Sequence, residues 1–427
     1  MIAVPALVYA TGAFGFFAIP YAIILYPFVF ATMPVLWQAA KAKGRITAAD
    51  VVFANYDSRP LELAVALTGV VATMPYIALQ LVGMETVFEA VGLKGAVPLI
   101  AAFALLAFNT YFSGLRAPAL IAVVKDRLIY IVVLVAVLLI PAKLGGYGAV
   151  FAAADAAFKA KGSGGILLSD AQFLPYVSLT VGSALALFMY PHALTGIFAS
   201  ASANAIRRNA ILLPAYSIVL ALIALMGLMG HAAGLKLSNP NEVVPLLFKS
   251  LFPGWFAGVA FAAIAIGALV PAAIMSIGAA NLFTRNFWKA YVRAGASPAE
   301  EARVAKMSSL AVVGGALLFI LFLPVQYALD LQLLGGLWVL QIFPAIIFGL
   351  FTSWFRPSGL LLGWIAGFSG GTLLVCWDGF KPAGKLYALF GAHRPFSQYS
   401  HCCAGERVLS SHDEGKKRPC PVARLFQ

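Results

Sequence analysis

The chain alternates between long apolar runs and short polar segments. A bilayer crossing needs about 20 apolar residues in a helix, and about ten runs reach or approach that length. They are predicted at residues 14–38, 61–91, 97–111, 128–141, 174–209, 210–233, 255–283, 310–325, 331–355 and 360–377. Residues 1–13 form half of a further span with no polar flank before it, which indicates a missing N-terminal portion. The pattern predicts an all-α polytopic membrane protein.

One run, Leu174–Asn209, is interrupted in its middle. It reads LPYVSLTVGSALALFMYPHALTGIFASASANAIRRN, with Pro191 and Gly196 inside it. Proline removes a backbone donor and clashes with the preceding turn, and glycine weakens a helix. Peptide groups freed at membrane depth must face protein or a water-filled cavity. Broken helices of this kind form substrate sites in secondary transporters, so the sequence predicts a membrane transporter with this segment on the substrate path.

Composition agrees with a membrane protein. Hydrophobic residues make up 62% of the chain and charged residues 11%, with a mean hydropathy of +0.92, whereas a soluble domain carries about a quarter charged residues. The net charge of +13 does not indicate a nucleic-acid partner, because the basic residues gather in alternate short loops. That asymmetry places the loop beginning at Lys41 in the cytoplasm.

Polar side chains inside the predicted spans are candidates for the substrate site, because they are costly there. Tyr190 and His192 flank Pro191. His192 could bond a substrate carboxylate or relay a proton, or simply bond a carbonyl freed by the break. Tyr76 and Gln80 share one face of a helix, for which side-chain packing is the alternative. Gln341 lies mid-span before Pro344 and invites the same interpretation.

Charged residues fall near the ends of the predicted spans rather than in the middle. No lysine or arginine is predicted mid-span, so an anionic substrate would meet helix N-termini and freed N–H groups. Three acidic residues at cytoplasmic edges are expected to pair with nearby arginines: Glu62 with Arg59, Asp126 with Arg127 and Asp50 with Arg45.

Two further features limit the functional classes. The sequence contains no phosphate loop, nucleophile elbow or HExxH motif, so it does not indicate an enzyme or an ATP-driven pump. Residues 379–427 differ abruptly from the rest and hold three of the four cysteines, Cys402, Cys403 and Cys420, without metal-ligand spacing. We predict a transmembrane domain at 1–378 and a disordered or aberrant tail at 379–427.

Several long runs resemble the sodium:solute symporter family. They are FMYPHALTGIFASAS with IRRNAILLPAYS, AVALTGVVATMPYIALQLVGMETVF and ALVPAAIMSIGAANLFTRNFWKAY, and they look like its bacterial monocarboxylate permease branch. The resemblance covers about residues 1–378. It implies a leucine-transporter-type bundle of two inverted repeats in the bacterial inner membrane. It also implies import of lactate, pyruvate or a related short acid together with a cation, without a cofactor.

The sequence departs from that family in ways that affect coupling. The inner half of the first core helix is absent, and the tail replaces the final helix or helices. Sodium-coupled relatives place two adjacent hydroxyl residues on the eighth core helix, where matching AAIMS gives only Ser276. The coupling ion is therefore left open between Na+ and H+. Another substrate (proline, a sugar or pantothenate), a membrane sensor and a non-functional truncated product are the alternatives.

Overall fold

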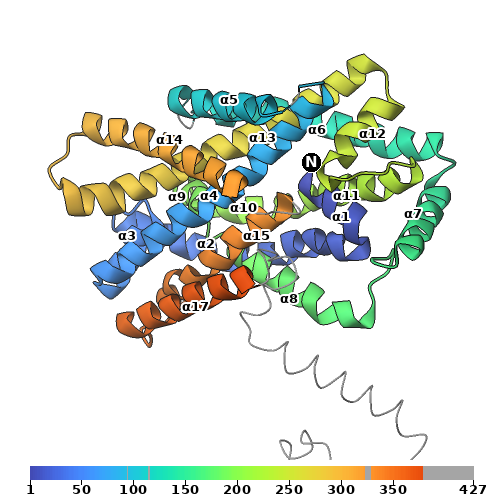
Figure 1. Ribbon diagram of the computed structural model, residues 1–427. Helices are drawn as coiled ribbons and strands as arrows, with labels where there is room; N and C mark the ends of the chain where they lie inside the picture. Colours follow the sequence, from blue (N-terminus) through green and yellow to red (C-terminus); the bar gives the residue numbers. More distant parts are fainter. Residues whose placement is uncertain (94, 114–115, 323–327, 378–427) are drawn as a thin grey trace, which may run out of the picture. The chain divides into compact units, whose positions relative to one another are not determined.

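The computed structural model describes residues 1–93, 95–113, 116–322 and 328–377 (Figure 1). The predicted tail at 379–427 lies outside these residues. The described part is built from helices, without strands. The α-helices are α1 Ala3–Thr11, α2 Ala18–Ala42, α3 Ala48–Tyr56, α4 Arg59–Ala90, α5 Val97–Ser113, α6 Arg116–Lys143, α7 Tyr147–Lys161, α8 Asp170–Leu187, α9 Pro191–Phe198, α10 Ala203–Leu212, α11 Tyr216–Ala232, α12 Val243–Leu251, α13 Gly254–Phe283, α14 Pro298–Phe322, α15 Ala328–Val339, α16 Gly349–Phe351 and α17 Pro357–Trp377.

Shorter elements join or extend several of these helices. A 3-10 turn, Ala13–Phe17, links α1 to α2, and 3-10 turns at Leu213–Ala215 and Pro240–Glu242 precede α11 and α12. A π-helical segment, Thr284–Val292, continues α13. Beyond α15 the chain continues through Leu340–Ile342 and Pro344–Phe348.

Every apolar run predicted from the sequence contains a helix. Among the described residues, 7 helices are long and apolar enough to cross a membrane, and 2 further pairs of helices qualify if each bent pair is one span. The shorter apolar helix Val97–Phe112 accounts for the remaining predicted run. The prediction of an all-α polytopic membrane protein is therefore confirmed, with helix ends shifted from those expected.

The stretch between the predicted spans at 128–141 and 174–209, expected to be a loop, contains a helix. The Gly/Ala-rich stretch before the broken run contains α7, whose sequence is YGAVFAAADAAFKAK. Alanine has the highest helix propensity, and glycines with positive φ at Gly146 and Gly162 bound the helix. Its axis turns by 79° from that of α6, so α7 is a second helix beyond the span rather than its continuation.

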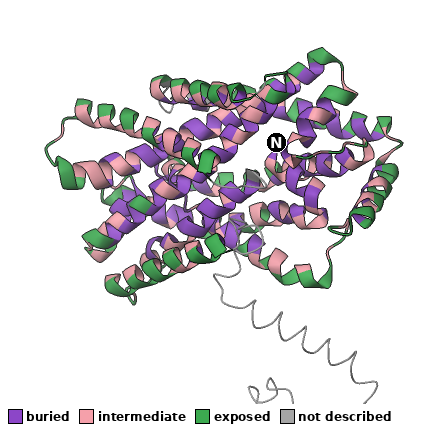
Figure 2. Cartoon of the chain, viewed as in Figure 1, coloured by how far each residue is buried: buried purple, intermediate pink, exposed green. Residues whose placement is uncertain are grey.

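The bundle is organised around α4 and α13. The most apolar window of α4 is 67% buried, whereas that of α17 is 11% buried, so α4 is central and α17 peripheral. Figure 2 shows the same contrast, with buried positions concentrated on α4 and α13. Large apolar side chains face outward on the peripheral helices, among them Ile100, Phe108, Leu138 and Leu373. Such a surface suits contact with lipid.

Candidate functional site

The span at Leu174–Asn209 is broken where the sequence indicates. Helix α8 ends at Leu187 and α9 begins at Pro191, and the axes of the two helices differ by 48°. Tyr190 between them has an extended backbone, with φ −64° and ψ 140°. Pro191 occupies the first turn of α9, where its missing N–H costs no intrahelical bond. The predicted break is confirmed.

Glycines on three different helices make room for this break. A Cβ on Gly278 of α13 would lie 3.1 Å from the backbone N and Cα of His192. A Cβ on Gly69 of α4 would lie 2.9 Å from Pro191 Cγ, and one on Gly335 of α15 would lie 2.6 Å from the Tyr190 hydroxyl. We call Gly69, Gly278 and Gly335 the glycine socket. At each position a neighbouring group comes so close to the glycine backbone that a side chain would not fit, which is the reason for glycine there.

The socket brings three of the predicted site residues together. The rings of Tyr76, Tyr190 and His192 lie with centroids 5.1 to 5.7 Å apart. The Tyr190 hydroxyl donates a hydrogen bond of 2.9 Å to the carbonyl oxygen of Gln332 on α15. His192 Nδ1 is buried and has no hydrogen-bond partner in the described part of the chain. A buried polar atom without a partner is the kind of group that a bound solute would satisfy.

A cavity of about 260 Å³ is lined by Tyr76 of this aromatic group, whereas Tyr190 and His192 are not among its lining residues. Tyr76 and Gln80 line it from α4, and Gln332 lines it from α15. The first residues of the chain, Met1 to Pro5, also border it. It therefore combines an apolar wall with hydroxyl and amide groups, as small-molecule sites do.

Lys125 also lines this cavity, from a helix that begins earlier than the predicted span at 128–141. The predicted span begins at residue 128, so Lys125, Asp126 and Arg127 were expected to precede the helix, but α6 already begins at Arg116. The Lys125 side chain is 15% exposed, and its ammonium lies 2.8 Å from the Asp126 carboxylate. Asp126 therefore pairs with Lys125 rather than with Arg127, and the wall of the cavity contains an ammonium group held in this ion pair.

The two other predicted site residues lie apart from the aromatic group. Gln341 borders a separate pocket together with α17, packs against Gly367, and donates a 3.1 Å hydrogen bond to the carbonyl of Leu337. Ser276 is fully buried in α13, and its hydroxyl donates to the Ala272 carbonyl at 2.8 Å.

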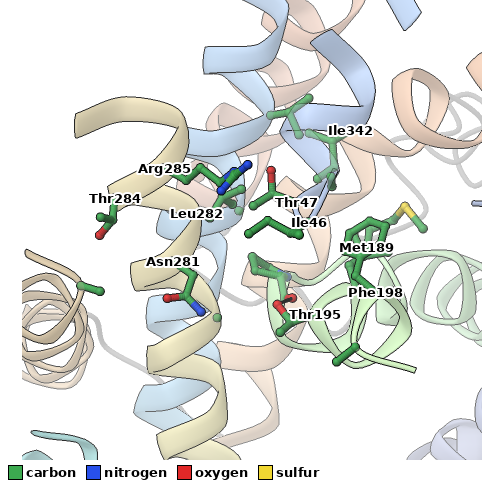
Figure 3. A pocket seen from close by; sticks show the side chains of 18 of the residues that line it. Ile46, Thr47, Met189, Thr195, Phe198, Asn281, Leu282, Thr284, Arg285 and Ile342 are labelled. Atoms are coloured by element: carbon green, nitrogen blue, oxygen red, sulfur yellow. Dashed lines mark hydrogen bonds between the residues drawn. The ribbon is translucent and has the colours of Figure 1, made fainter. Parts of the chain in front are cut away.

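A larger cavity of about 470 Å³ lies on the other side of the break (Figure 3). It is bordered by Pro191 and Thr195 of α9, by the end of α13, and by the start of α3. Lys41 at the end of α2 and Ile46 in the loop that follows also border it, and this loop is on the basic, cytoplasmic side. We call this cavity the cytoplasmic vestibule.

A buried polar network lies beside the vestibule and ties α3 and α4 to the π-helical segment that continues α13. The Asn286 amide donates to Asp50 at 2.8 Å and to Glu62 at 2.9 Å. Arg285 bonds the second oxygen of Asp50 at 3.0 Å, and Arg59 bonds that of Glu62 at 2.8 Å. Thr47 caps α3 by accepting from the Asp50 N–H, and its hydroxyl donates to Asn286. The expected Glu62–Arg59 pair is confirmed, whereas Asp50 pairs with Arg285 and not with Arg45.

These features define a class of protein. A helix broken at membrane depth, a cavity with polar groups in its wall near the break, and a vestibule leading from the break to one side together form the architecture of a secondary transporter. The family model for the sodium:solute symporter family matches residues 1–367. The chain belongs to the sodium:solute symporter family.

Relatives agree with that assignment. The chain is 66% identical to a monocarboxylate transport permease protein of Rhizobium johnstonii over 94% of this chain and 81% of that protein. It is 33% identical to the uncharacterized symporter YodF of Bacillus subtilis over 83% of this chain and 72% of that one.

A solved structure shows the same fold. It is the substrate-bound outward-open state of a Na+-coupled sialic acid symporter, which superposes with a TM-score of 0.69 at 16% identity. The match covers 92% of this chain and 86% of that one. The leucine-transporter-type bundle expected from the sequence is confirmed.

Proposed function

We propose that this protein is a cation-coupled symporter that imports short monocarboxylates, such as lactate and pyruvate, by alternating access. The similarity to the Rhizobium monocarboxylate permease is the observation that carries the substrate class, because it extends over 94% of the chain. The chemistry of the cavity at the break suits that class. An ammonium, tyrosine hydroxyls and amides are donors for a carboxylate, and a volume of about 260 Å³ suits a small solute.

Within this proposal, Tyr76, Gln80, Tyr190 and His192 form the substrate site, with Lys125 as a neighbouring cation. His192 contributes an Nδ1 without a partner among the described residues, and Tyr76 lines the cavity. Gln341 has no part in this arrangement because its amide is directed to its own helix and to α17. We expect His192→Ala to lower the transport rate and to alter its pH profile.

Coupling to a cation follows from energetics. Moving one charge across the membrane is worth about 2.3 kcal/mol per 100 mV, so a carboxylate entering a negative-inside cell moves against the potential. One cation cancels that cost, and a second makes uptake favourable. We propose Na+ as this cation because the chain belongs to a sodium:solute symporter family, with H+ as the alternative. Ser276 remains the candidate cation ligand, through the lone pairs that its bond to Ala272 leaves free.

The test is uptake into right-side-out vesicles. Labelled lactate and pyruvate should accumulate when an inward Na+ gradient is imposed at constant pH, while proline, glucose and pantothenate should not. Replacing Na+ by choline should abolish accumulation. Accumulation that survives choline but collapses with a protonophore would instead assign H+. Uptake of proline, glucose or pantothenate in place of the two acids would overturn the substrate class.

A further inference from the structure

The cytoplasmic vestibule contains hydrogen-bond donors that the protein itself does not use. Asn281 lies in α13, and its side-chain amide has no hydrogen-bond partner among the described residues. Arg285 follows one turn later, and among the same described residues it bonds only through its Nε, to Asp50. Guanidinium carries five N–H donors, so both terminal nitrogens of Arg285 remain available.

The two side chains point into the same space. Figure 3 shows Asn281 of α13 and Arg285 of its π-helical continuation directed toward Thr195 and Thr47. Residues one helical turn apart share a face, which explains the common direction. The opposite walls are apolar, with Leu194 and Phe198 of α9 among them.

The ionic groups of the vestibule leave an excess of positive charge. The Arg285–Asp50 pair is neutral as a unit, and Glu301 is bonded to Lys289. Lys41 at the rim is exposed and lies 5.9 Å from the Trp37 ring centroid, without an acidic partner in the described part of the chain. An anion in this space would therefore meet donors and a favourable field.

We propose that Asn281 and Arg285 form a second carboxylate site, on the release side of the transport path. It lies between the break and the cytoplasm, and a carboxylate there accepts from the Asn281 amide and from the terminal nitrogens of Arg285. This geometry favours planar, charge-assisted bonds to a carboxylate. The inference rests on the proposed function, since the transported acid is the ligand.

The site is tested by comparing affinities from the two faces of the membrane. KM for labelled lactate is measured in right-side-out and in inside-out vesicles, for the unmodified protein and for Asn281→Leu. We expect Asn281→Leu to raise KM from the cytoplasmic face about tenfold, which corresponds to about 1.4 kcal/mol. KM from the outer face should stay within about twofold, because the residue lies beyond the break. Lactamide, which lacks the carboxylate, should compete poorly from the cytoplasmic face.

Two further variants keep the test decisive. Asn204→Leu is the matched control, because it makes the same substitution at an exposed position of α10 outside the vestibule, and both KM values should stay unchanged. Asn281→Asp preserves size and polarity and places a carboxylate beside Arg285, so it should raise the cytoplasmic KM further. If Asn281→Leu does not reach the membrane, the cytoplasmic KM of Asn281→Asp decides whether the second site exists. An unchanged cytoplasmic KM, or equal changes on both faces, rejects the second site. Failure of the unmodified protein to take up either acid rejects the proposed function itself.

Discussion

The glycine socket and the buried network beside the vestibule hold the same bundle together by different means. At the break, three glycines let backbones and ring edges approach within about van der Waals contact, and one hydrogen bond, from Tyr190 to Gln332, fixes the polar end. At the cytoplasmic end, four ionised groups and the Asn286 amide form a connected network.

The difference follows from access to water. At membrane depth an unpaired charge costs several kcal/mol, so shape complementarity holds the break and its polar atoms remain available to a solute. At the cytoplasmic end Arg59 and Arg285 reach solvent while Asp50 and Glu62 are buried. Ionised carboxylates are tolerated there because each of their buried oxygens accepts a hydrogen bond. The first region is therefore sensitive to added volume, and the second to lost donors.

Removing the donor shared by both carboxylates should have the largest effect. Asn286→Leu leaves one oxygen of Asp50 and one of Glu62 buried without its amide partner. Breaking a buried charged interaction typically costs about 3–5 kcal/mol, and we expect a loss in that range in the free energy of unfolding, measured by denaturation in micelles. The matched control is Asn204→Leu on the exposed face of α10, which should change stability by less than about 0.5 kcal/mol. Equal losses in the two variants would contradict the network's role.

Adding one methyl group at the socket should have the next largest effect. In Gly335→Ala the new Cβ would overlap the carbonyl oxygen of Ala72 and lie 2.6 Å from the Tyr190 hydroxyl. Overpacking costs about 1–3 kcal/mol, and we expect that loss together with a strong fall in transport, because the break would shift. Gly196→Ala is the control, since its Cβ would enter open space; it should be neutral or slightly stabilising. Full transport by Gly335→Ala would show that the socket does not position the break.

The sequence predicts one of these two regions much better than the other. The break at Pro191 is local, because proline and glycine act on their own helix, and hydrophobic length alone identified the spans. The network joins Asp50 and Glu62 to Asn286 across more than half the chain, and no local pattern indicates that contact. The sequence places Lys125 before the helix for a related reason. Three consecutive charged residues are typical of a loop, yet here they lie within α6.

The two tyrosines at the break separate structural from binding roles. Tyr190→Phe removes the bond to the Gln332 carbonyl and should lower stability by about 1 kcal/mol. Tyr76 faces the cavity, and its hydroxyl has no protein hydrogen bond in the described residues, so Tyr76→Phe should leave stability within about 0.5 kcal/mol. Instead, Tyr76→Phe should raise KM for lactate several-fold, about the effect of one hydrogen bond. Denaturation and uptake kinetics on the same two variants check this division, which is wrong if the effects are reversed.

Glu242, a carboxylate outside the network, should show the smallest effect, and its sign should be opposite to that expected for the network. Burial, together with the nearby Glu89 carboxylate, raises the pKa of Glu242 above its usual value. An acid whose pKa is raised on folding stabilises the folded state when it is protonated. Its contribution to the free energy of unfolding therefore falls as pH rises from about 4.3, the unfolded pKa, and levels off above the folded pKa. Glu242→Gln should therefore leave stability unchanged near pH 4 and raise it slightly at pH 7, by a fraction of a kcal/mol because the side chain is largely solvated. Glu89→Gln should produce part of the same gain by removing the like charge. A loss of stability in Glu242→Gln that grows with pH would mean that this carboxylate, like those of the network, is held by donors.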